Sequence, residues 1–450
     1  MSRGDAALVA TAAIVAALII AVVYVPDVGR GFVKDDFGWI RDARLTIARP
    51  SNAWLQPAPE FYRPIVTESF ALDYTLHGLN PRWYGFTNLT LYLACAVSVA
   101  ALLRRAGVSP GAAAIGAFAW GMNPHGINMA VLWLSGRTSL LLTLFSVLAA
   151  LAFLTGRRVV GAMLLVAALL SKEEATVMPF VIGAWIALLR PERRPDWWRD
   201  AVALAIPLLV YAALRSQTAA MTPSTAPWFY RPTLDPRAIA RNVVEYADRG
   251  LTFFAALTGI AAVVYGWRPI SQTRRALIIA AAVWFAGGYV LTVWLPVRSS
   301  LYAVLPSVGS ALACAAACDA LRKAKGVGSL FARDVRMAAA LACVLLLIPI
   351  YKRRNDRWVA PARLSARAVD VIVANPPGPG LVVLEEDVED PNEPRPYSSF
   401  MDAFGDVADV AISVLVQRPM EARIVTPPAR WSGPAAARYK LTGGRIERIE

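Results

Sequence analysis

Residues 32–39 read Phe-Val-Lys-Asp-Asp-Phe-Gly-Trp and place two adjacent carboxylates, Asp35 and Asp36, shortly after the first apolar run of the chain. Neighbouring side chains diverge, by about 100° on a helix, so the two carboxylates cannot both point at one atom. One can act as a base while the other binds a metal, an acceptor or a helix N-terminus. An exposed polar turn or a helix cap is the simpler alternative. We interpret the pair as awaiting a substrate at a membrane surface.

The composition indicates a membrane protein. The 450 residues are 57% hydrophobic and 17% charged, whereas soluble chains carry about 25% charged residues. A helix crosses a bilayer with about 20 predominantly apolar residues. We therefore predict an all-α polytopic membrane protein of about eleven transmembrane helices. They are expected near residues 6–25, 83–103, 111–122, 140–155, 159–170, 176–189, 201–214, 251–267, 276–295, 301–321 and 337–350.

The formal net charge of +14 is explained by the orientation of the chain in a membrane and does not indicate a nucleic-acid-binding protein. The basic residues form short clusters between the apolar runs, the pattern of the positive-inside rule. These clusters are Arg104-Arg105, Arg157-Arg158, 190–199, 268–275 and 322–336. They predict a cytoplasmic N-terminus. No basic groove with interleaved aromatic residues accompanies them, so we expect no nucleic-acid partner.

The chain is expected to have two parts. Residues 1–354 form the transmembrane domain, with a first outer loop at 26–82 that carries the acidic pair. Residues 355–450 have a soluble composition and predict a small α/β domain on the outer face. Its signals are a strand at 381–384, helical periodicity at 402–417 and a hairpin about Gly443-Gly444.

The same topology brings cations to the face that holds the acidic pair. Ionisable groups at membrane depth cost about 2.5–3.5 kcal/mol each and commonly serve function, although each alone can be a snorkelling anchor. The cations are Arg63, Arg137, Lys172 and Arg298. A lipid phosphate needs Arg or Lys, and a carboxylate can take a proton from an attacking hydroxyl. Together these groups suggest glycosyl transfer from a polyprenyl-phosphate sugar.

The order of the motifs resembles a known family. The motifs are Asp35-Asp36, Tyr62-Arg63-Pro64, 78–81, Asn88, 133–137, 170–173, Arg298, Leu301-Tyr302 and 306–309. This pattern is similar to that of the GT-C membrane glycosyltransferases, especially bacterial relatives of the transmembrane and tetratricopeptide O-mannosyltransferases. The repeats of the latter are absent.

The resemblance implies an inverting transferase at the outer face of a bacterial inner (plasma) membrane. Its donor would be a polyprenyl-phosphate sugar and its acceptor a protein or glycan hydroxyl. Asp35 or Asp36 would be the catalytic base and, if a divalent cation such as Mg²⁺ or Mn²⁺ takes part, its ligand. The donor phosphate would be bound by Arg137, Lys172 and Arg298. The substrate pocket would include Tyr62, Arg63, Glu173, Tyr302 and His125.

Two other classes of protein compete with this interpretation. A secondary transporter or lipid flippase predicts polar residues near mid-helix and inverted repeats, whereas the helix centres here are almost wholly apolar. A non-catalytic scaffold would use the outer domain to bind a partner. Binding by residues 355–450, without sugar transfer by the whole chain, would favour the scaffold.

Overall fold

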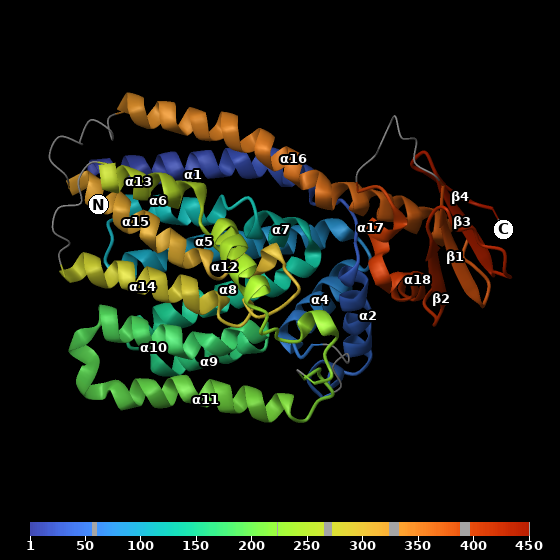
Figure 1. The fold of residues 1–450 in the computed structure, drawn as a ribbon, viewed down its shortest axis with the longest axis horizontal. Helices are drawn as coiled ribbons and strands as arrows, with labels where there is room; N and C mark the ends of the chain where they lie inside the picture. The colour runs from blue at the N-terminus through green and yellow to red at the C-terminus, as the bar shows by residue number, and fades with distance from the viewer. Residues whose placement is uncertain (56–60, 223, 265–271, 324–332, 388–396, 450) are drawn as a thin grey trace.

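A bundle of roughly parallel apolar helices makes up most of the molecule (Figure 1). The computed structural model describes residues 1–55, 61–222, 224–264, 272–323, 333–387 and 397–449. Each of the eleven predicted runs coincides with a helix there, although 265–267 of the eighth run and parts of the clusters 268–275 and 322–336 lie outside the described residues. The helices are α1 Arg3–Val23, α5 Pro81–Ala106, α6 Pro110–Gly121, α8 Arg137–Leu154, α9 Arg158–Leu169, α10 Met178–Leu189, α11 Trp197–Arg215, α13 Phe253–Val264, α14 Gln272–Tyr289, α15 Ser307–Lys323 and α16 Arg333–Ala374.

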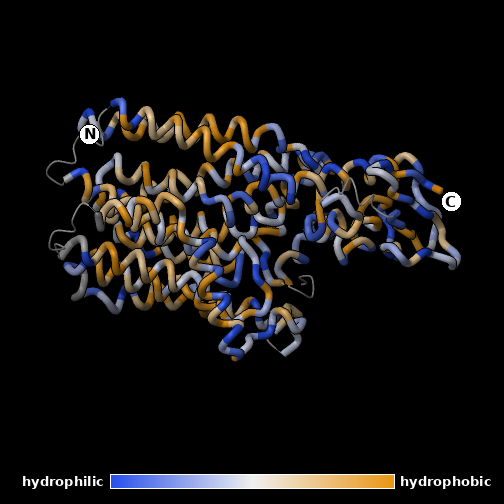
Figure 2. Tube along the Cα trace, turned by 45° about the horizontal axis from the view of Figure 1, so that its top comes forward, coloured by the Kyte–Doolittle hydropathy of each residue, from blue (hydrophilic) through white to orange (hydrophobic). Residues whose placement is uncertain are grey.

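The bundle is built to lie in a membrane. Six helices among the described residues are long and apolar enough to span one: those beginning at Arg3, Pro81, Leu134, Trp197, Ser300 and Arg333. The outer surface of α11 exposes the apolar side chains of Val202, Ile206 and Leu209. Contiguous exposed apolar side chains of this kind mark a surface that contacts lipid or protein rather than water. Figure 2 shows hydrophobic residues concentrated along the bundle helices. The chain is a multi-pass membrane protein, as predicted.

The two ends of the bundle carry different elements. The N-terminus lies at one end, and α2 (Asp35–Ala48), α4 (Pro64–His77) and the C-terminal sheet lie at the other (Figure 1). At the N-terminal end Arg322 is paired with Asp5 at 2.6 Å, and Arg190 donates to the carbonyl of Arg105. The predicted separation of basic clusters from the acidic pair is therefore present, while the assignment of the two ends to the two faces of the membrane stays a prediction.

The C-terminal part is a four-stranded sheet that continues from α16. This helix has 42 residues, a length of about 63 Å, and passes the predicted boundary at 354/355 without a break, so a division there stays a prediction. The strand order is β2-β1-β3-β4, with β1 parallel to β2 and β3, and β3 antiparallel to β4. The strands are β1 Leu381–Glu386, β2 Glu421–Val425, β3 Ala437–Thr442 and β4 Arg445–Arg448. The predicted strand and hairpin are confirmed, but the predicted helix at 402–417 is divided into α17 (Phe400–Phe404) and α18 (Ala408–Val416).

A second apolar core joins the first outer loop to this C-terminal part. The described residues of the first outer loop include three helices, α2, the short α3 (Asn52–Leu55) and α4. Phe37 of α2, Phe70 of α4 and Phe404 of α17 are fully buried in one cluster. The outer loop is therefore packed between the bundle and the sheet. Two further helices lie between the predicted runs: α7 (Gly126–Leu132), which precedes α8, and α12 (Pro236–Gly250).

Candidate active site

A cavity of about 620 Å³ opens where α2 meets the end of the bundle. This volume is in the range of small-molecule sites. Its lining combines charged, hydroxyl and aromatic side chains from segments far apart in the sequence. The polar and aromatic lining residues are Lys34, Asp35, Trp39, Arg41, Asp42, Thr46, Asn52, Phe61, Arg63, Thr67, Trp133, Ser135, Thr138, Lys172, Tyr230, Ser299, Tyr302 and Trp358. Among the described residues, no group of three or more His, Cys, Asp or Glu side chains is placed to hold a metal ion.

The acidic pair is divided between the cavity and the core. Asp35, the first residue of α2, is exposed and lines the cavity, where the helix N-terminus favours its negative charge. Asp36 is fully buried. It accepts hydrogen bonds from the backbone N–H of Val33 at 2.9 Å, the N–H of Ser135 at 2.7 Å and the Ser135 hydroxyl. Burial raises the pKa of Asp36 to about 7, and these hydrogen bonds oppose the rise. The carboxylate of the pair that faces the cavity is therefore Asp35.

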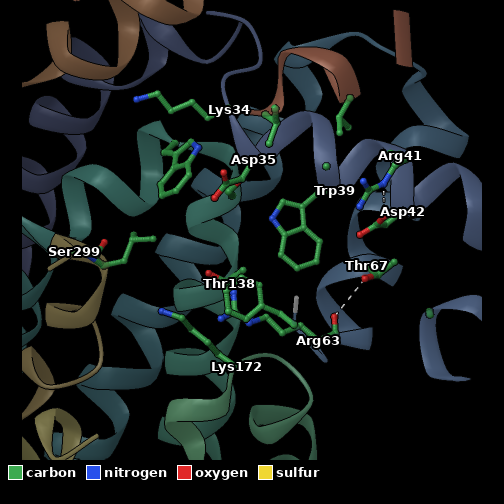
Figure 3. Close-up of a pocket in the computed structure, with 18 of the residues that line it drawn as sticks. Lys34, Asp35, Trp39, Arg41, Asp42, Arg63, Thr67, Thr138, Lys172 and Ser299 are labelled. Atoms are coloured by element: carbon green, nitrogen blue, oxygen red, sulfur yellow. Dashed lines mark hydrogen bonds and ion pairs between the residues drawn. The ribbon is translucent and has the colours of Figure 1, made fainter. Parts of the chain in front are cut away.

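Arg63 and Lys172 lie across the cavity from Asp35 (Figure 3). Thr138 lies between Asp35 and these two cations. Arg63 binds Glu173 through two parallel hydrogen bonds, Nε to Oε2 at 2.9 Å and Nη2 to Oε1 at 2.5 Å. Its guanidinium also lies over the ring of Phe61 at 3.9 Å. No described residue accepts from Nη1, so two N–H donors remain for a ligand.

Lys172 is buried beside the cavity and has a similar arrangement. Its ammonium lies 2.7 Å from an oxygen of Glu174, donates to the Ser139 hydroxyl at 3.1 Å and lies over the ring of Tyr302 at 5.0 Å. An ammonium has three donors, and two are accounted for here. Glu174 keeps one buried oxygen, Oε2, for which no described residue is a partner. Lys172 and Tyr302 both line the cavity, and their roles in binding a substrate stay predictions.

The other predicted phosphate-binding residues lie outside this lining. Arg137 is fully buried, paired with Asp73 at 2.5 Å, and donates to Asn88 at 3.0 Å and to the carbonyl of Ser69. It points between α4 and α5 because the buried Asp73 carboxylate requires a counter-charge there. Arg137 therefore lies outside the cavity lining, and its contact with a phosphate stays a prediction. Arg298 is paired with Glu245 of α12, although its neighbour Ser299 does line the cavity.

Three predicted pocket residues, Tyr62, Glu173 and His125, lie outside the cavity lining. Tyr62 is fully buried against Tyr211, with ring centroids 6.1 Å apart. Glu173 orients Arg63 from behind. His125 interacts instead with Arg354, 3.2 Å away on α16. In each case the local motif identified a residue near the site but not the direction of its side chain.

The lining residues that follow residue 354 carried no signal for this cavity in the sequence. Trp133 and Trp358 stack at 5.0 Å, with 11° between their planes, and both line the cavity. Val407 and Val410 reach it from the C-terminal part. Trp358, Val407 and Val410 therefore line the cavity although they lie in the region that the sequence analysis interpreted as a separate domain. The pairing of Asp73 with Arg137 and of Glu245 with Arg298 had no local signal, since the partners lie 64 and 53 residues apart along the chain.

Comparison with solved structures gives the fold an identity. ArnT from Cupriavidus metallidurans, solved bound to undecaprenyl phosphate, matches with a TM-score of 0.55 and 14% sequence identity over 91% of this chain and 85% of that one. The oligosaccharyltransferase AglB from Archaeoglobus fulgidus, in complex with an inhibitory peptide and a dolichol-phosphate, matches with a TM-score of 0.51 and 14% identity, over 94% of this chain and 64% of that one. Both are GT-C superfamily membrane glycosyltransferases, so the expected fold is confirmed. No protein-family model matches the chain, and no curated protein matches its sequence.

The Arg137–Asp73 pair is predicted to stabilise the fold. Arg137→Met leaves Asp73 buried without its counter-charge, which should cost about 3–5 kcal/mol of unfolding free energy. Arg241→Gln is the matched control, because Arg241 is 63% exposed in its pair with Glu245 and should cost about 1 kcal/mol or less. Thermal unfolding of the detergent-solubilised variants measures both. Equal losses in the two variants would contradict a structural role for Arg137.

Proposed function

We propose that this protein is an inverting glycosyltransferase that moves a sugar from a polyprenyl-phosphate carrier to a hydroxyl of a protein or glycan. The observation that carries the proposal is the cavity with Asp35 on one side and Arg63 and Lys172 on the other. The shared fold adds support, because its neighbours were solved with undecaprenyl phosphate and dolichol-phosphate. We place the reaction at the outer face of a bacterial inner membrane.

In this reaction the acceptor hydroxyl attacks the anomeric carbon from the side of Asp35. The Asp35 carboxylate takes the hydroxyl proton as the new C–O bond forms. The bond between the anomeric carbon and the phosphate oxygen breaks, and its electron pair leaves with the polyprenyl phosphate. Arg63 Nη1 and the third N–H of Lys172 bind the phosphate oxygens, where negative charge develops.

Aromatic and hydroxyl side chains complete the lining between these two ends. Trp39, the stacked Trp133 and Trp358, and Tyr230 offer apolar surfaces for a sugar ring, while Thr138 and Ser299 offer hydroxyls. Ligand sites of this kind combine an apolar wall with a few polar groups that fix orientation. Mass spectrometry of outer-face glycans and glycoproteins from cells with and without the protein identifies the sugar that is transferred.

Neutralising Asp35 is predicted to lower the transfer activity, whereas neutralising Asp36 is predicted to lower the yield of folded protein. Asp35→Asn should lower glycosyl transfer about 100-fold or more, the usual contribution of a general base, with normal yield of folded protein. Asp36→Asn should instead lower the yield of folded protein, because an amide nitrogen replaces one acceptor in its hydrogen-bond set. Transfer is measured as the glycan product by mass spectrometry, and folding by size-exclusion chromatography in detergent.

The exposed Asp409→Asn, outside the cavity lining, is the control for both measurements. Full transfer by folded Asp35→Asn would remove the proposed base. Normal transfer by Asp36→Asn, with Asp35→Asn misfolded, would reverse the assignment of the two residues.

The two lining cations are predicted to set the affinity for the lipid phosphate. Each charge-assisted hydrogen bond contributes about 1.5–3 kcal/mol, so Arg63→Gln and Lys172→Gln should each raise the Kd for undecaprenyl phosphate by about 10- to 100-fold. Arg298→Gln should leave it nearly unchanged, because Arg298 lies outside the cavity lining. Binding to the protein in nanodiscs is measured by native mass spectrometry. An unchanged Kd in the two lining variants, or a loss confined to Arg298→Gln, would contradict this assignment.

A further inference from the structure

The residue before Asp35 has an unusual backbone conformation. Lys34 has φ +49° and ψ −124°, a region that side chains other than glycine rarely adopt. Such a conformation persists only where its surroundings impose it. Because Lys34 is the N-cap residue of α2, directly before Asp35, its conformation sets where the Asp35 side chain enters the cavity.

The turn at Lys34 is held on one side by hydrogen bonds from a residue of the bundle, Ser135. Ser135 donates to the buried Asp36 carboxylate through both its N–H and its hydroxyl, and the same carboxylate accepts from Val33. The residues on either side of Lys34-Asp35 are thereby fixed.

On its other side the turn is held by the C-terminal region, more than 360 residues further along the chain. The backbone N–H of Lys34 donates to the carbonyl of Ala403 at 2.9 Å. Ala403 is fully buried in α17, and α17 is held by a capping box between Ser399 and Asp402. The rings of Phe37 and Phe404 lie 5.7 Å apart in the same contact.

The turn that follows α17 also touches Lys34. Gly405 has φ +59°, and a Cβ placed on it would lie 3.4 Å from Cγ of Lys34. Two residues later the chain reaches the cavity at Val407. The segment from Phe400 to Val407 thus contacts both the residue that orients Asp35 and the cavity itself.

We infer that the segment 400–407 is a positioning element for Asp35: its contact with Lys34 holds the turn that aims the carboxylate into the cavity. The consequence for catalysis rests on the proposed function, in which Asp35 is the base. The contact itself can be tested without any transfer reaction, so the two ideas can fail separately.

The first test is hydrogen–deuterium exchange of the full chain in nanodiscs. Gly405→Ala places a side chain on a backbone with positive φ, which is strained, and brings its Cβ into van der Waals contact with Lys34. Gly78→Ala is the matched control, because Gly78 has φ +57° but no atom within 4 Å of an added Cβ. We expect peptides covering residues 32–37 to exchange about tenfold faster in Gly405→Ala, through local opening, and at the wild-type rate in Gly78→Ala. Unchanged exchange at 32–37 in Gly405→Ala, or equal acceleration in both variants, would overturn the inference.

The second test uses transfer kinetics and the double variant Lys34→Gly/Gly405→Ala. With an undecaprenyl-phosphate hexose that the wild-type protein turns over as the probe, Gly405→Ala should lower kcat about tenfold, because small misplacements of a catalytic group are costly. The KM for the lipid should stay within about twofold, since Arg63 and Lys172 are not moved. Lys34 itself lines the cavity, so the double variant is compared with Lys34→Gly alone. In that background Gly405→Ala should change kcat less than twofold, because glycine removes the contacted side chain and tolerates the positive φ. An equal, tenfold loss in both backgrounds would overturn the positioning role, whereas full activity of Asp35→Asn would contradict the proposed base and leave the contact itself untouched.

Discussion

The buried Asp36 carboxylate is the constraint on which the arrangement of the site depends. A carboxylate without water must have its oxygens satisfied by donors, and here the donors come from Val33 in its own turn and from Ser135 at the end of the bundle. This requirement fixes the beginning of α2 against the residues before α8. Once Asp36 is held inward, the divergence of adjacent side chains turns Asp35 outward. One carboxylate of the pair thus provides the anchor and the other faces the cavity.

The cations at this end of the bundle are divided by the same physics. Arg137, fully enclosed, has its donors used by Asp73, Asn88 and backbone carbonyls, so it ties α4, α5 and α8 together. Arg63 and Lys172 are also paired with carboxylates, but they border open space and keep donors unused among the described residues. The fully enclosed Arg137–Asp73 pair therefore stabilises the fold, because no ligand can reach it. The pairs of Arg63 and Lys172 border the cavity, so their unused donors can bind an anion.

The sequence predicted what depends on local pattern. Apolar runs identify helices because each run must be buried or face lipid along its own length, and the eleven predicted runs coincide with helices. The hairpin at Gly443-Gly444 is local in the same way. Side-chain direction at a charged residue depends instead on a distant partner, so nothing near Arg137 separates it from Lys172. The contribution of Trp358 and Val407 to the cavity depends on how the C-terminal part folds back, for which no local signal exists.

The carboxylates next to Arg63 and Lys172 have a consequence for an anionic ligand. The two cations and their partners Glu173 and Glu174 sum to zero formal charge, so a phosphate would be bound through directed donors rather than through an excess of positive charge. Glu173 holds the guanidinium by two parallel hydrogen bonds, which aligns Nη1 before any ligand arrives. Donors oriented in advance need little reorganisation when charge develops on a leaving phosphate, and this favours the transition state over the ground state. Glu173 and Glu174 therefore orient the N–H donors of Arg63 and Lys172, while their negative charges lower the overall attraction of the site for anions.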